Sequence, residues 1–282
     1  MKKLWCSCIL FVLLFAACGT PKKEPIENNE VYFNNTYCNL KLTNEMCPFM
    51  FNYAYCGEKP IMGGMVAMAE SGEEFPVEVE EFEILNLENG YTIVRGSCHM
   101  DISKLEFGTQ TEITELLVKM NEEDVRIPLK QAYHIEKAEL VDNAPVYWTN
   151  IPGVMFESGS FYKEYKFCYT TQEDVVITGF EFLDFITVTE AEIFVNEVSL
   201  GNMKEVFPLE LKAGEELKIQ ALGDFSEYGN IDIVTNIILS YQYEGKEMEC
   251  RAVTKNYVIK NKNIGSELLK ENGIDIEGEE TE

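Results

Sequence analysis

The residue types most often used for catalysis and metal binding are sparse in this chain. His99 and His134 are its two histidines, and neither stands in a metal-binding spacing such as His-Glu-x-x-His or His-x-His. Cys98 directly precedes His99, and neighbouring side chains of a strand point to opposite faces. We therefore expect no cysteine–histidine dyad here, and the sequence predicts no metal site and no cofactor.

Carboxylates are abundant, but their use in catalysis depends on a geometry that residue types alone do not give. The densest cluster lies between Glu73 and Glu83, where alternation places Glu78 and Glu80 on one solvent-facing side of a strand. Glycoside hydrolysis needs two carboxyls at a defined separation across a cleft. An extracytoplasmic glycan hydrolase with paired carboxylates is therefore the alternative function. Oxygen ligands for a calcium ion also gather in one segment, at Asp224, Asn230 and Asp232, without the ligand pattern of an EF-hand.

Aromatic residues form two clusters, within residues 46–55 and within residues 147–162. Exposed rings stack on sugar faces or anchor a protein partner, whereas buried rings fill a core. The second cluster lies in a segment rich in loop residues between two expected domains. We therefore predict Tyr147 and Trp148 as a possible interaction surface, with core packing as the alternative for both clusters.

The N-terminus carries a processing signal. Two lysines precede an apolar run from residue 4 to residue 15, and small residues follow, which is the order of a secretory signal peptide. The run is shorter than the roughly 20 residues that span a bilayer. Phe15-Ala16-Ala17-Cys18 resembles the lipobox of bacterial lipoproteins, although a lipobox usually has Leu where Phe15 stands. The resemblance implies that Cys18 receives a diacylglyceryl group and becomes the mature N-terminus. Ordinary cleavage after Ala17, which would release a soluble chain, is the alternative.

The cysteines that follow Cys18 are even in number, which in an extracytoplasmic protein favours disulfides over free thiols. Cys168 and Cys250 are the only two in the C-terminal half, so their pairing is the most economical prediction. The remaining candidates lie in the N-terminal half, with their pairing open: Cys38, Cys47, Cys56 and Cys98.

Charge excludes one class of partner. The chain has 23 basic and 49 acidic residues, a formal net charge of −26, and loss of the leader with its two lysines makes it more acidic. Such a surface repels nucleic acid. The expected partners are the membrane, through the lipid, and an envelope protein or a glycan.

The rest of the chain reads as short strands. Residues 19–35 are polar and lack apolar periodicity, which predicts a tether. Alternation with a slip at Glu81 predicts a bulged strand, and Asn89-Gly90 predicts a hairpin before residues 91–94. Further strands are expected at 112–119, 124–130, 132–140, 164–170, 174–186, 191–196, 205–211, 216–222, 231–243 and 247–258, and a short helix at Gly265 to Lys270.

A weak internal similarity links the two halves. Val94-x-Gly96, Asn121-Glu122 and Pro128 recur in the same order as Ile177-x-Gly179, Asn196-Glu197 and Pro208, although gaps are needed. A duplicated Ig-like module and chance recurrence of strands and turns are both open interpretations.

Many short strands without alternating helices predict an all-β fold of two tandem antiparallel, Ig-like β-sandwich domains. The expected organisation is a signal peptide (1–17), a lipidated cysteine and tether (18–35), an N-terminal β domain (36–145), a C-terminal Ig-like sandwich (146–262) and an acidic tail (263–282). With no catalytic motif found, the leading hypothesis is a non-catalytic cell-envelope lipoprotein that serves binding, adhesion or assembly.

Overall fold

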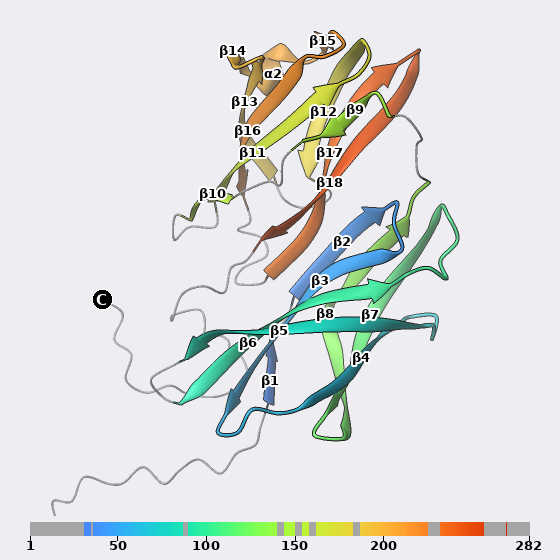
Figure 1. Ribbon diagram of the computed structural model, residues 1–282, viewed down its shortest axis with the longest axis vertical. Coiled ribbons are helices and arrows are strands. Elements are labelled where there is room, and N and C mark those ends of the chain that lie inside the picture. Colours follow the sequence, from blue (N-terminus) through green and yellow to red (C-terminus); the bar gives the residue numbers. More distant parts are fainter. Residues whose placement is uncertain are drawn as a thin grey trace, which may run out of the picture.

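The chain forms two β units that lie end to end (Figure 1). The computed structural model describes residues 31–34, 36–86, 90–139, 144–149, 154–157, 162–182, 187–224, 232–256 and 269. Within these ranges nearly all of the secondary structure is β-strand. The one helix of more than a single residue among the described residues is α2 (Met203–Val206), which has four residues. The predicted all-β class is confirmed. No helix in the described part of the chain is long and apolar enough to cross a bilayer.

The N-terminal unit is one strongly curved sheet. Its strands run in the order β1-β3-β6-β5-β4-β7-β8-β2. Their bounds are β1 (Val31–Asn34), β2 (Thr36–Leu42), β3 (Met46–Cys56), β4 (Met62–Ala69), β5 (Glu74–Asn86), β6 (Tyr91–Asp101), β7 (Thr109–Met120) and β8 (Glu123–Lys137).

This sheet folds over and encloses a core. Phe49 of β3 and Tyr133 of β8 belong to strands far apart in the sheet order, yet their ring centroids are 5.4 Å apart. The Tyr133 hydroxyl also hydrogen bonds to the hydroxyl of Thr36 in β2, which in turn donates to the Met50 carbonyl of β3 at 2.7 Å. The two ends of the sheet are therefore pressed against each other across apolar side chains.

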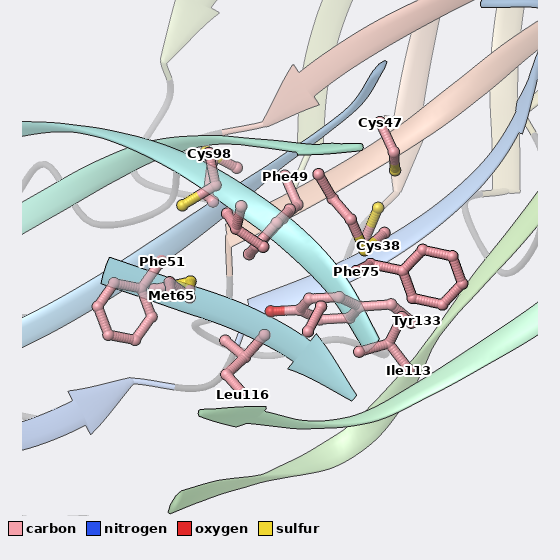
Figure 2. Packing of buried hydrophobic residues seen from close by; sticks show 14 of the residues in the cluster. Cys38, Cys47, Phe49, Phe51, Met65, Phe75, Cys98, Ile113, Leu116 and Tyr133 are labelled. Carbon is pink, nitrogen blue, oxygen red and sulfur yellow. The ribbon is translucent and has the colours of Figure 1, made fainter. Parts of the chain in front are cut away.

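The core of the N-terminal unit contains three thiols (Figure 2). Cys38, Cys47 and Cys98 are fully buried among aromatic and aliphatic side chains. Gly96 of β6 lies in the same close packing, because a Cβ added there would stand 3.0 Å from Cγ1 of Val79. The aromatic cluster predicted within residues 46–55 is thus mainly core, as one of its two interpretations proposed.

The C-terminal unit is a sandwich of two antiparallel sheets. One is formed by β12 (Val175–Phe182), β15 (Leu209–Leu211), β17 (Asp232–Tyr243) and β18 (Lys246–Asn256), which continue the large sheet. The other, sheet B, contains β9 (Val146–Trp148), β10 (Val154–Glu157), β11 (Tyr162–Thr171), β13 (Thr187–Val195), β14 (Val198–Asn202) and β16 (Glu216–Asp224). The two sheets face each other across aromatic rings: Phe167 of β11 and Phe180 of β12 have centroids 5.3 Å apart.

The two units share hydrogen-bonded backbone. β17 pairs in parallel with β2, from Asp232 opposite Thr36 to Thr235 opposite Asn39, so one sheet runs through both units. The tandem sandwiches expected from sequence are therefore joined by strand pairing as well as by the connecting chain.

A buried ion pair reinforces this junction. Oδ2 of Asp232, which is fully buried, accepts hydrogen bonds from Nη2 of Arg95 at 2.9 Å and Nε at 3.2 Å. It also accepts one from Nδ2 of Asn52 at 2.8 Å. Asp232 begins β17, and its partners belong to β6 and β3, so Arg95 of the N-terminal unit neutralises one buried carboxylate of the C-terminal unit at the joint.

Most predicted strands coincide with observed ones, but several observed strands were not predicted: β1, β2, β3, β4, β9 and β10. β1 lies within the segment 19–35 that was predicted as a tether, and it pairs with β3. The predicted strands 124–130 and 132–140 form one continuous strand, β8.

Two further local details differ. The residues 205–211, predicted as a strand, contain the end of α2 and β15, because the Asn202 side chain accepts from the Lys204 amide and caps a helix. The irregularity in β5 falls between Glu83 and Leu85 rather than at Glu81. The predicted hairpin between β5 and β6 is present, while its Asn89 lies outside the described residues. Of the predicted helix at 265–270, only Leu269 is described.

The internal similarity matches two equivalent turns. Asn121-Glu122 joins β7 to β8 and Asn196-Glu197 joins β13 to β14, and all four residues have positive φ angles between 47° and 69°. Paired positive φ values give the turn twist that suits a two-residue hairpin. The Asn-Glu repeats noted in sequence therefore mark the same local structure in each unit.

Candidate functional site

The predicted interaction surface is only partly at the surface. Tyr147 and Trp148 lie on β9, which pairs with β11. Tyr147 is 41% exposed, whereas Trp148 is partly buried against the core of the C-terminal unit. The backbone of Trp148 also hydrogen bonds to the Cys250 thiol. Tyr147 is therefore available to a partner, while Trp148 mainly fills the core.

The histidines do not meet a nucleophile. Cys98 is buried in the core while His99 is exposed on the other face of β6, as the alternation predicted. Nδ1 of His134 lies 3.3 Å from Oε1 of Glu112 on the surface of β7 and β8. Neither arrangement contains the hydrogen-bonded nucleophile and base that covalent catalysis requires.

The three residues considered for calcium are not shown together. Asp224 ends β16. Asp232 is neutralised by Arg95 in the buried junction, and Asn230 lies in the undescribed segment 225–231. Among the described residues, no group of three or more His, Cys, Asp or Glu side chains is placed to hold a metal ion.

The predicted disulfide between Cys168 and Cys250 is not formed. None of the six described cysteines forms a disulfide in this structure. Phe167 and Tyr169 point into the core from β11, so Cys168 between them faces the outer side of sheet B. Cys250 packs against the inner side of the same sandwich. Burial raises the pKa of the Cys168 thiol and raises that of Cys250 to about 11, so both favour the un-ionised, unreactive form.

Strand β14 is the most distinctive exposed element in the described part of the chain. It pairs only with β13 and forms one edge of sheet B. None of its five residues is charged, and Val198 and Leu200 are 63% and 44% exposed. Exposed edge strands usually carry charges or proline that prevent pairing with other chains. β14 has neither, which makes it a candidate binding edge.

The hairpin that presents β14 is fixed by local chemistry. The Asn196-Glu197 turn reverses the chain after β13, and the amide of Glu216 donates to Oδ1 of Asn196 at 3.0 Å. Nζ of Lys218 lies 2.5 Å from Oε2 of Glu197 and stacks over the Phe194 ring at 4.3 Å from its centroid. The side-chain bond to Lys218 is the main reason that the pKa of Glu197 lies below its usual value.

A groove of about 580 Å³ lies on sheet B beside this edge. Glu164, Glu190 and Glu192 line it, and Gly201 and Asn202 of β14 form part of its wall. No lysine or arginine is among its lining residues. The side chain of Gln220 donates a hydrogen bond to the carboxylate of Glu164. This neighbour is polar but uncharged, so the negative charge of the groove is not neutralised by a lining residue. The site therefore combines an unpaired backbone edge with an acidic flank.

The edge strand β14 was not predicted from the sequence. Val198-Ser199-Leu200 follows a two-residue turn and alternates apolar and polar residues, which is the signal that could have identified it. Its exposure, in contrast, follows from the position of β14 at the end of sheet B, which strand patterns do not give.

Comparison with known proteins identifies no family. No family model and no curated protein matches the chain. The adhesive subunit CfaE of the CFA/I fimbria of enterotoxigenic Escherichia coli is similar over 82% of this chain and 93% of its own, with 10% identity and a TM-score of 0.25. Cadherin-like domains 1 to 4 of zebrafish RET are similar over 81% of this chain and 51% of their own, with 11% identity and a TM-score of 0.29. Similarities this weak support no conclusion about function, and the fold assignment rests on the strands themselves.

Proposed function

We propose that this protein is a non-catalytic binding protein of the bacterial cell envelope, displayed on a membrane surface and acting in adhesion or assembly through a protein partner. The observation that carries the proposal is the edge strand β14, which is exposed and free of charged residues. Such an edge offers unpaired backbone groups and apolar side chains, the two features that another chain uses for docking.

The shared sheet supports a role in display. Parallel pairing of β2 with β17 and the Arg95–Asp232 ion pair join the two units. A force applied to one unit is therefore transmitted to the other through backbone hydrogen bonds, and the two units keep a fixed relative position. A partner bound at sheet B would thereby be held at a defined place relative to the N-terminal unit.

Membrane attachment through Cys18 is part of the proposal. Cys18 lies outside the described residues, and the support is the signal peptide and the lipobox-like Phe15-Ala16-Ala17-Cys18. Two or more acyl chains give stable anchoring, because each buried CH₂ contributes roughly 0.8 kcal/mol. Palmitate labelling of cells that express the full chain should mark the wild type and not Cys18→Ser. Labelling of neither protein would contradict the anchor without affecting the binding edge.

The binding role is tested with envelope extracts and purified glycans. The wild-type protein and a Val198→Lys/Leu200→Lys variant are used as baits on solubilised envelopes, with partners identified by mass spectrometry. A partner retained by the wild type and lost by the variant supports the proposal. Capture that is equal for both baits would contradict it. Turnover of a glycan by the purified protein, lost on changing one Glu or Asp, would favour the hydrolase instead.

A further inference from the structure

The described edges of the two sheets differ in how they are protected. β18 carries Lys246, Glu247, Glu249 and Arg251 along its length, and such charges oppose pairing with another strand. β15 has three residues and an exposed glutamate. β1 lacks charge, but its residues are partly buried against the N-terminal core. Of these four strands, β14 alone is both uncharged and exposed. In sheet B, β9 is also uncharged and exposes Tyr147, but it has three residues, and β10 carries Glu157.

The two faces of β14 present different chemistry. Oγ of Ser199 donates to Oε1 of Glu192 at 2.5 Å, which places Ser199 on the outer, acidic face of sheet B. Val198 is the preceding residue of the same strand and so faces the opposite side. The register shift in the β13–β14 pair leaves Leu200 without an opposite residue in β13, and its side chain is exposed. An added strand would therefore meet Val198 on one side and carboxylates on the other, with the exposed Leu200 at the bulge between them.

Charge decides between the occupants. The groove beside β14 is lined by three glutamates and no basic residue, and the whole chain has a net charge of −26. A second copy that paired edge to edge would bring its own Glu190 and Glu192 toward these groups, and like charges across an interface are unfavourable. A segment with lysine or arginine would be attracted instead.

We propose that β14 receives an extended segment of a partner protein in which apolar residues alternate with lysine or arginine. The segment adds as a further strand of sheet B, with its backbone bonded to the free edge of β14. Its apolar side chains cover Val198 and Leu200, and its basic side chains lie beside Glu192 and Glu190. This inference rests on the proposed binding function and specifies the partner's chemistry and its mode of docking.

The probe is a synthetic peptide of alternating valine and lysine, compared with one of alternating valine and glutamate. Binding to the leader-free chain is followed by fluorescence anisotropy of labelled peptide, and the contact is mapped by backbone amide chemical shifts. The cationic peptide should bind with an affinity that falls as salt rises and should shift amides of β14. The Val198→Lys/Leu200→Lys variant should bind it about tenfold more weakly or worse, because like charges face each other across the edge.

Glu247→Lys at an exposed position of the charged edge β18 changes the net charge by the same amount as the double β14 variant. It is the matched control and should leave binding unchanged. Both β14 substitutions are at exposed positions, and the shift map on the wild type does not depend on either variant folding. Equal binding of both peptides, equal binding by the edge variant, shifts confined to other strands, or self-association through β14 would each overturn the inference. If the peptide fails but an envelope partner still requires Val198 and Leu200, the binding function stands and only the partner's chemistry is wrong.

Discussion

The buried ion pair at the junction makes a strong prediction about stability. In the Arg95→Met variant, the fully buried carboxylate of Asp232 loses the positive charge of Arg95 and both hydrogen bonds from its guanidinium. The hydrogen bond from the Asn52 amide to Oδ2 of Asp232 remains. Removing one partner of a buried pair costs about 3–5 kcal/mol, since the remaining charge stays desolvated. For folded units of this size each kcal/mol lowers the thermal midpoint by about 2–4 °C, so we expect a fall of roughly 6–20 °C.

The same substitution should separate the two units. Trp148 lies in the C-terminal unit and is the only tryptophan after residue 5, so its fluorescence in a leader-free chain reports that unit alone. Circular dichroism reports the strands of both units. In urea the wild type should give one midpoint by both probes, whereas Arg95→Met should give two.

Two further variants test the reasoning. Arg95→Met/Asp232→Leu removes both charges and should recover most of the lost stability, because an apolar replacement of a buried pair is often neutral. Lys212→Ala removes an exposed pair with Asp174, whose atoms are 2.9 Å apart, and should change little because exposed pairs contribute little. If Arg95→Met lowers the free energy of unfolding by less than about 1 kcal/mol, and the fluorescence and circular dichroism midpoints still coincide, the Arg95–Asp232 pair does not hold the two units together.

The remaining predictions concern packing, ionisation and thiol access. Gly96→Ala should cost about 1–3 kcal/mol by overpacking, whereas Gly179→Ala, whose added Cβ meets Ser240 at an ordinary 3.6 Å, should be nearly neutral in urea titrations; equal effects would contradict the packing described. Burial raises the pKa of Tyr241 to about 12, so its contribution to the free energy of unfolding is full below about pH 10, where an unfolded tyrosine ionises, and is lost as the pH rises toward 12. Tyr241→Phe should make the decline in the free energy of unfolding at alkaline pH shallower, and an unchanged decline would exclude Tyr241 as one of its sources. Cys56 is partly exposed and should react with maleimide in the native protein, while the fully buried Cys98 should react only on unfolding; mass spectrometry showing equal rates would argue against the core as described.

Strand positions were largely predictable from local patterns, because alternation and turn residues act within a few residues of one another. β17 was expected at 231–243 and is found at Asp232–Tyr243, and β16 was expected at 216–222 and is found at Glu216–Asp224. The short β14 was missed, since five residues after a tight turn give a weak pattern. β2 and β3 were also missed, because they are buried along nearly their whole length and therefore lack the alternation of a half-exposed strand.

Features formed by distant residues were not predictable in this way. Arg95 and Asp232 are 137 residues apart in the chain, and only the parallel pairing of β2 with β17 brings them together. The cysteine pairing failed for a related reason. Counting placed Cys168 with Cys250, but strand alternation sends Cys168 to the outer side of sheet B. Local sequence specifies strands, whereas the neighbours of each strand depend on the whole fold.

Site-specific photo-crosslinking in living cells tests directly whether β14 is a binding edge. A benzophenone amino acid replaces Leu200 on the exposed edge β14 or, as a control, the exposed Glu247 on the charged edge β18, in the full chain. Binding at β14 predicts a discrete crosslinked product from position 200, absent from position 247, with the partner peptide identified by mass spectrometry. No product at position 200, or the same products from both positions, would contradict a binding role for this edge.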